Sequence, residues 1–99
     1  MLFHGISGRA ATPYNATSTS FLCVAPPIER TGTVNTGGLL GNCDRVIWMD
    51  WLAYVAGGST VLGEPFSPGA VVNVQAWYRD SQSPGGSNLS DALEFTLAP

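Results

Sequence analysis

The chain has 99 residues and a formal net charge of −3, with 11% charged residues and no Lys. It lacks the basic run that binds nucleic acids or anionic membranes, and no apolar stretch is long enough to span a membrane. We therefore expect neither a nucleic-acid partner nor a membrane span. The length predicts one domain over residues 1–99. The 44% apolar residues, separated by Gly, Pro, Ser, Thr and Asn, are typical of short strands joined by turns.

The first third of the chain predicts three strands. Leu2–Ile6 is the first, and residues 7–14 follow it as a stretch punctuated by Gly and Pro. Thr19–Ala25 is the second, and Pro26–Pro27 ends it because proline has no backbone N–H for a sheet hydrogen bond. Ile28–Val34 is expected as an edge strand or as one arm of a hairpin.

The segment Arg45–Val55 has an ambiguous period. Its odd positions form one apolar face, and its even positions form a second face that only Asp50 interrupts. This pattern, rich in aromatic and β-branched residues, favours a strand that is buried on both sides. A helix between Asp44 and Gly57 is the alternative, since these two residues could cap its ends.

The last third predicts two strands, Gly69–Arg79 and Asp91–Ala98, joined by a loop over Asp80–Ser90. In both strands every second side chain shares a face. Two final strands joined by such a loop are typical of a hairpin at the end of a sandwich or barrel. The expected core residues are Phe21 or Leu22, Val72, Val74, Leu93, Phe95 and Leu97.

Cys23 and Cys43 are the only cysteines. They are too few for a zinc ribbon, which leaves a disulfide or two buried thiols. A disulfide suits a small domain without Lys better, and closing a loop of about 20 residues would contribute roughly 3 kcal/mol. The expected fold class is all-β: a disulfide-stapled antiparallel β-sandwich (jelly-roll-like or immunoglobulin-like) or a partly open barrel.

Four features stand out together, namely Phe21–Val24 (FLCV), the Cys43–Asp44 step before Met49–Trp51 (MDW), Val74–Asp80 (VQAWYRD) and Asn88–Leu93 (NLSDAL). The pattern resembles an uncharacterised C-terminal domain of long secreted or surface proteins from planctomycetes, myxobacteria and related bacteria. Trp77–Asp80 is the most specific part of this resemblance, which spans most of the chain. It implies a β-rich module of a secreted or cell-surface parent protein, and it implies no activity. Residues 1–5 carry no signal-peptide pattern, so we expect a fragment or a short relative of such a parent.

Candidate catalytic groups are few. His4 is the only histidine, and without a Gly-x-Ser-x-Gly motif a Ser–His–Asp triad is disfavoured, which favours a surface or capping role. Asp50 lies among aromatic residues, where burial would raise its pKa and make it the acid of a small hydrolase-like enzyme. The favoured interpretation is a structural role, either an ion pair with Arg45 or Arg79 or hydrogen bonds to the backbone. We expect no catalytic residue and no enzyme.

The residues Asp80, Asn88 and Asp91 could hold Ca²⁺ together with loop carbonyl oxygens, because Ca²⁺ prefers oxygen ligands and tolerates loop geometry. Their spacing fits no EF-hand. Asp and Asn are also common turn residues, so an ordinary loop is the favoured interpretation. We expect no metal and no other cofactor.

Aromatic residues are the candidate binding groups. Neighbouring strand residues point to opposite faces, so Trp77 and Tyr78 cannot both enter one core. With Trp48 and Trp51 they are candidates for a stacking surface, although core packing accounts for most such rings. The expected function is a non-catalytic extracellular module for attachment, assembly or ligand contact, with a carbohydrate-binding module as the alternative. The expected partners are a second copy, the rest of a parent protein, or a glycan.

Overall fold

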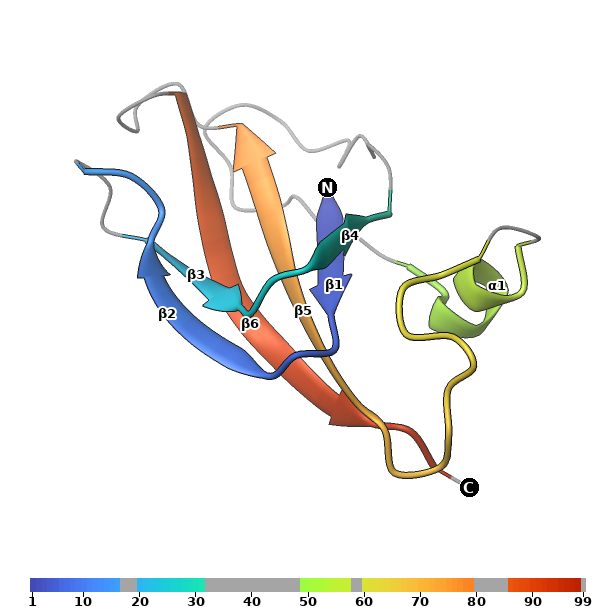
Figure 1. Ribbon diagram of the computed structural model, residues 1–99. Helices are drawn as coiled ribbons and strands as arrows, with labels where there is room; N and C mark the ends of the chain where they lie inside the picture. The colour runs from blue at the N-terminus through green and yellow to red at the C-terminus, as the bar shows by residue number, and fades with distance from the viewer. Residues whose placement is uncertain (17–19, 32–48, 58–59, 80–85, 99) are drawn as a thin grey trace.

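The computed structural model describes residues 1–16, 20–31, 49–57, 60–79 and 86–98. Within these residues the strands form two separate antiparallel sheets rather than a closed barrel (Figure 1). The four-stranded sheet has the order β4 (Ile28–Arg30), β1 (Leu2–Gly5), β5 (Val71–Arg79) and β6 (Ser87–Thr96), and the two-stranded sheet pairs β2 (Arg9–Pro13) with β3 (Phe21–Val24). The helix α1 (Trp51–Val55) is the one helix of the described part. The mainly β, antiparallel class expected from the sequence is confirmed.

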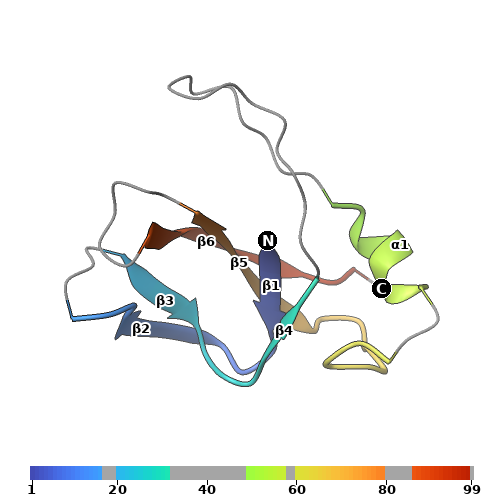
Figure 2. The same cartoon turned by 90° about the horizontal axis from the view of Figure 1, so that it is seen from above.

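The four-stranded sheet has two faces that carry different side chains. The register places Phe3 opposite Gln75 and His4 opposite Val74, and successive side chains of a strand point to opposite faces. Phe3, Gln75 and Trp77 therefore lie on the face toward β2 and β3, here called the inner face. His4 and Val74 lie on the other, outer face. Seen from above, β2 and β3 lie on one side of β5 and β6, and α1 lies away from β2 and β3 (Figure 2).

The core lies on both sides of β5. Four consecutive residues of this strand are buried, namely Val72, Asn73, Val74 and Gln75. A strand with one face in water would alternate between buried and exposed positions, so both faces of β5 are covered here. On the inner face the buried apolar cluster consists of Phe3, Val24 and Leu89. The expected burial of Val72 and Val74 is confirmed.

Other members of the expected core lie elsewhere. Leu93 is 63% exposed, so its predicted burial was wrong. Of the two alternatives Phe21 and Leu22, Phe21 is 49% exposed. Leu22, the alternative to Phe21, packs against the inner cluster. Phe95 and Leu97 are half-buried. The reason for the contrast on β6 is the position of α1, whose Trp51 ring lies 5.4 Å from the Phe95 ring and leaves Leu93 uncovered.

The two sheets are joined through Gln75. Its Oε1 accepts a hydrogen bond from the backbone N–H of Cys23 at 3.0 Å, and its Nε2 donates to the carbonyl oxygen of Phe21 at 2.8 Å. The sheets also approach closely at Gly5, where an added Cβ atom would lie 2.7 Å from Cγ1 of Val24. A side chain does not fit in that space, so this position requires glycine.

The strand expected over Arg45–Val55 was wrong where the structure describes it, because a helix begins at Trp51. Asp50 caps this helix: its side chain accepts a hydrogen bond at 3.1 Å from the N–H of the third helical residue, which satisfies a free amide at the helix start. Trp51 and Tyr54 are three residues apart and so share one side of the helix. Both rings contact the ring of His4 on the outer face.

The sequence also missed β2 and the beginning of β6. β2 lies in the stretch interpreted as turns, and its register with β3 is irregular between Arg9 and Thr12. Its last residue is Pro13, which an edge strand tolerates because the missing N–H faces no partner. β6 begins at Ser87, inside the predicted loop. The edge position expected for Ile28–Val34 is confirmed for β4, and its continuation beyond residue 31 lies outside the described residues, as do residues 45–48 and 80–85.

Cys23 lies half-buried on β3 and carries a free thiol in the structure. Its Sγ lies 3.5 Å from the carbonyl oxygen of Phe21. Cys43 lies outside the described residues, so the pairing of Cys23 with Cys43 stays a prediction.

Candidate functional site

A cleft of about 610 Å³ lies between the two sheets. Its size falls within the range of about 300–1,000 Å³ that is typical of small-molecule sites. The lining residues on β5 are Trp77 and Arg79. Both come after Gln75 along the strand, so the cleft lies beyond the hydrogen bonds by which Gln75 joins the two sheets. The full lining consists of Met1, Phe3, Thr12, Pro13, Tyr14, Leu22, Ile28, Arg30, Trp77, Arg79 and Leu89.

The floor of the cleft is apolar. Phe3 is 3% exposed and Leu89 is 7% exposed, and both belong to the inner cluster. Leu22 and Trp77 are partly buried and pack against that cluster. These side chains come from both sheets, because alternation on each strand points them toward each other. A bound molecule would therefore meet an apolar surface on two sides.

Hydrogen bonds fix the two aromatic rings of the cleft. The indole Nε1 of Trp77 donates to the hydroxyl oxygen of Tyr14 at 2.9 Å. That hydroxyl also lies 2.6 Å from Oγ of Ser87. Because Tyr14 follows β2 while Trp77 is on β5 and Ser87 is on β6, these bonds cross from one sheet to the other. They hold the rings in place, which lowers the entropy that a ligand would lose by ordering them.

Two arginines line the cleft, Arg30 on β4 and Arg79 on β5. Both side chains are exposed. The one ion pair among the described residues joins Arg9 to Glu94, so neither of the two cleft arginines is neutralised in that part of the chain. The described part of the lining includes no Asp or Glu. The cleft is therefore positive at its polar edge, although the whole chain carries a net charge of −3.

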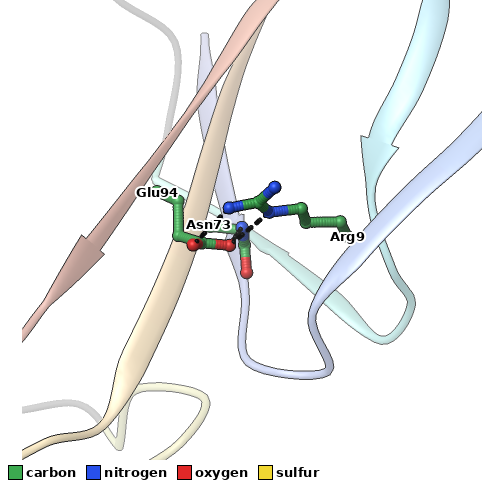
Figure 3. Close-up of polar contacts among 3 residues, drawn as sticks. All are labelled: Arg9, Asn73 and Glu94. Atoms are coloured by element: carbon green, nitrogen blue, oxygen red, sulfur yellow. Dashed lines mark hydrogen bonds and ion pairs between the residues drawn. The ribbon is translucent and has the colours of Figure 1, made fainter.

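A second polar cluster joins the sheets near Gly5 (Figure 3). Arg9 on β2 donates to both carboxylate oxygens of Glu94 on β6, at 2.8 Å each, and Asn73 donates to the same carboxylate at 2.9 Å. The hydrogen bonds from Arg9 and Asn73 lower the pKa of Glu94 to about 2. These bonds join β2 to β5 and β6 at this end of the space between the sheets, whereas the buried Oδ1 of Asn73 has no hydrogen-bond partner among the described residues.

A third cluster lies on the outer face around His4, which is completely buried. Its Nε2 lies 3.0 Å from the carbonyl oxygen of Leu62, and its Nδ1 has no hydrogen-bond partner among the described residues. The Tyr54 hydroxyl donates to Glu29 at 2.6 Å, and this bond lowers the pKa of Glu29. Burial, followed by the same bond, raises the pKa of Tyr54. The expected surface or capping role of His4 was wrong, because Trp51 and Tyr54 cover its ring.

The predicted aromatic candidates separate in the structure. Trp77 lines the cleft, whereas Tyr78 points to the outer face with 43% of its surface exposed. Trp51 packs against Phe66 and Phe95 and so belongs to the packing between α1 and the sheet. Trp48 lies outside the described residues.

The predicted polar candidates also lie apart from the cleft. Asp50 is exposed at the start of α1 and acts as its cap, so it is not the buried acid considered from the sequence. Of the calcium candidates, Asn88 and Asp91 lie on β6 rather than in a loop, and the Asn88 side chain accepts a hydrogen bond from Ser20. Asp80 lies outside the described residues.

Comparison with protein-family models, with curated proteins and with solved structures gives no match for this chain. Among the described residues no helix has the length and apolar character needed to cross a membrane. Any functional conclusion must therefore start from the cleft itself.

Proposed function

We propose that this domain is a non-catalytic extracellular β-module that binds a ligand in the cleft between its sheets. The observation that carries the proposal is the pair of rings, Tyr14 and Trp77, held across the cleft by a hydrogen bond of 2.9 Å above the apolar floor. Aromatic and apolar walls with a few fixed polar groups are typical of small-molecule binding sites.

The chemistry of the lining supports binding rather than catalysis. Among the described residues, its polar side chains are those of Thr12, Tyr14 and the two arginines. Proton transfer near neutral pH usually uses His, a carboxylate, Lys or Cys. A cleft of this composition can stack, donate hydrogen bonds and attract negative charge.

The remaining parts of the proposal come from the sequence. The secreted or cell-surface location follows from the resemblance at Trp77–Asp80, and the Cys23–Cys43 disulfide would suit that oxidising location. A β-sandwich of the jelly-roll or immunoglobulin type is the finer fold that we propose. Its support is the two-stranded sheet on the inner face of the four-stranded sheet.

The test uses 1-octanol as an uncharged apolar probe and cellohexaose as a probe for the carbohydrate-binding alternative. We expect 1-octanol to shift the backbone amide signals of cleft residues saturably in NMR titrations. Trp77→Leu should weaken this binding about tenfold or more, and Tyr78→Leu is the matched control because its ring lies on the outer face. Thr12→Trp, at an exposed position of the lining, should block the cleft without removing core atoms. Binding of cellohexaose alone would favour the glycan alternative, and shifts outside the cleft would contradict the proposal.

A second candidate function is assembly through the outer face. A groove of about 560 Å³ lies there, lined by Leu2, Met49, Trp51, Val74, Gln75, Ala76, Ser90, Asp91, Leu93 and Phe95. Leu93 is 63% exposed in it, and exposed apolar surface often marks an interface. The proposed partner is a second copy of this chain. Leu93→Ser should then convert a dimer into a monomer in sedimentation velocity experiments, and Leu52→Ser on α1 should not.

A further inference from the structure

The two cleft arginines are unusual for this chain. The sequence has only four basic residues against seven acidic ones, yet two of the four, Arg30 and Arg79, line the same cleft. Among the residues that the structure describes, no acidic side chain lines it. The composition of an acidic chain does not explain positive charge at one site. The two arginines therefore indicate that the cleft attracts negatively charged groups.

The register shows how the two charges are arranged. Arg30 lies opposite Phe3, and Phe3 lies opposite Gln75, which places Arg30 two strands away from β5. Arg79 lies four positions beyond Gln75 on β5. Strand geometry puts the two Cα atoms about 16 Å apart. The arginines therefore flank the apolar floor instead of forming one cluster.

The ligand must match both the apolar floor of the cleft and the two arginines that flank it. A guanidinium group forms two parallel hydrogen bonds with a carboxylate, a geometry that neutral groups do not match. An uncharged sugar would need many hydrogen-bonding side chains, whereas the lining as far as it is described offers only Thr12 and Tyr14 besides the arginines. An apolar body fits the surface of Phe3, Leu22 and Leu89.

We propose that the cleft binds an amphiphilic carboxylate, that is, a molecule with an apolar body and a carboxylate at its end. The apolar body lies along Trp77 and the other apolar side chains of the lining, and the carboxylate pairs with Arg30 or Arg79 at the edge. This inference rests on the proposed function of the cleft as a binding site and names the chemistry of its ligand.

The experiment compares octanoate with 1-octanol, which share an apolar chain and differ in charge. NMR titration of the full chain should show octanoate binding more tightly than 1-octanol, and added salt should reduce the difference. Arg30→Gln or Arg79→Gln should weaken octanoate binding about tenfold, the effect of one charged hydrogen bond. Neither substitution should change the binding of 1-octanol. Leu52→Glu is the charge control, because it also changes the net charge by −1 at an exposed position on α1.

The outcomes separate this inference from the proposed function. Weaker octanoate binding in either arginine variant, with folding unchanged by circular dichroism, supports the inference. Equal binding of octanoate and 1-octanol, unaffected by both substitutions, would overturn the inference and leave the cleft as a binding site. If neither probe gives saturable shifts at cleft residues, the proposed function fails together with the inference.

Discussion

Arg9 and Glu94 meet through two hydrogen bonds of 2.8 Å each, although 85 residues separate them along the chain. The pair connects β2 of one sheet to β6 of the other (Figure 3). Together with Gln75, this pair fixes the distance between the two sheets. The pair lies at one end of the space between the sheets and the cleft at the other, so the pair also determines the width of the cleft.

The first prediction concerns acid stability. The partners of Glu94 lower its pKa from 4.5 to about 2, so its ionised form is favoured in the folded state. Its contribution to stability is therefore fully present above the ordinary pKa and is lost as the pH falls from about 4.5 toward 2. Glu94→Gln should flatten the pH dependence of the free energy of unfolding in this window, measured by urea titration.

The control for acid stability is Asp91→Asn, an exposed position on the same strand. Its profile of unfolding free energy against pH should follow that of the wild type. An unchanged slope between pH 4.5 and 2 in Glu94→Gln would contradict the ion pair.

The second prediction concerns the buried amide of Gln75. Besides joining the sheets, its Nε2 donates to the carbonyl oxygen of Ser90 at 2.6 Å. Gln75→Met keeps the volume and removes all three hydrogen bonds, leaving backbone groups on β3 without partners. The free energy of unfolding should fall by about 2–3 kcal/mol. Thermal and urea unfolding measure this change, with the exposed Tyr78→Phe as control. A loss below about 0.5 kcal/mol would show that these bonds do not hold the sheets together.

The third prediction separates a helix from a strand at Asp50. Asp50→Ala removes the cap of α1 and should lower the free energy of unfolding by about 1 kcal/mol, whereas Asp50→Asn should keep most of the stability because Asn is also a good cap. If Asp50 instead served as a buried acid, the Asn variant would behave as poorly as the Ala variant. Urea denaturation of the two variants distinguishes these results.

The fourth prediction compares Leu93 and Phe95 on β6. The alternating sequence pattern predicts that both are buried on the same face. Phe95→Ala should cost about 2–3 kcal/mol, less than for a fully buried ring, because Phe95 is only partly covered by Trp51. Leu93→Ala should change stability by less than about 0.5 kcal/mol, as at other exposed positions. Equal losses in the free energy of unfolding would contradict this prediction. They would mean that Leu93 and Phe95 are buried to the same extent, as the alternating pattern suggests.

Period-two alternation was enough to find β1, β3, β5 and most of β6, because their apolar residues face a covered surface. It failed for β2, where Ala10, Ala11 and Thr12 carry little apolar area and Pro13 looks like a turn residue. It also failed at Trp51, because a short helix with aromatic residues three apart and a strand buried on both faces give the same apolar run. The capping function of Asp50 was the local signal that could have decided the case.

The cleft was only partly visible in the sequence. Alternation placed Trp77 and Tyr78 on opposite faces of one strand, but it did not indicate which of the two rings would line a site. Tyr14 and Arg30 reach the site through pairing between strands that are distant in sequence, so no local pattern marks them. The one available signal was the alternation of Trp77 and Arg79, an aromatic and a basic residue on the same side of one strand.

The length of α1 has a consequence for how the molecule opens. The helix has five residues, and isolated helices shorter than about 12 residues are marginal in water. It therefore exists only while Trp51 and Tyr54 remain docked on the outer face. Its amide hydrogens should exchange with solvent through a local opening, whereas those of β5 between the two layers should exchange only when the whole domain unfolds. We therefore expect two cooperative units, of which the one that contains the cleft stays closed while the other opens.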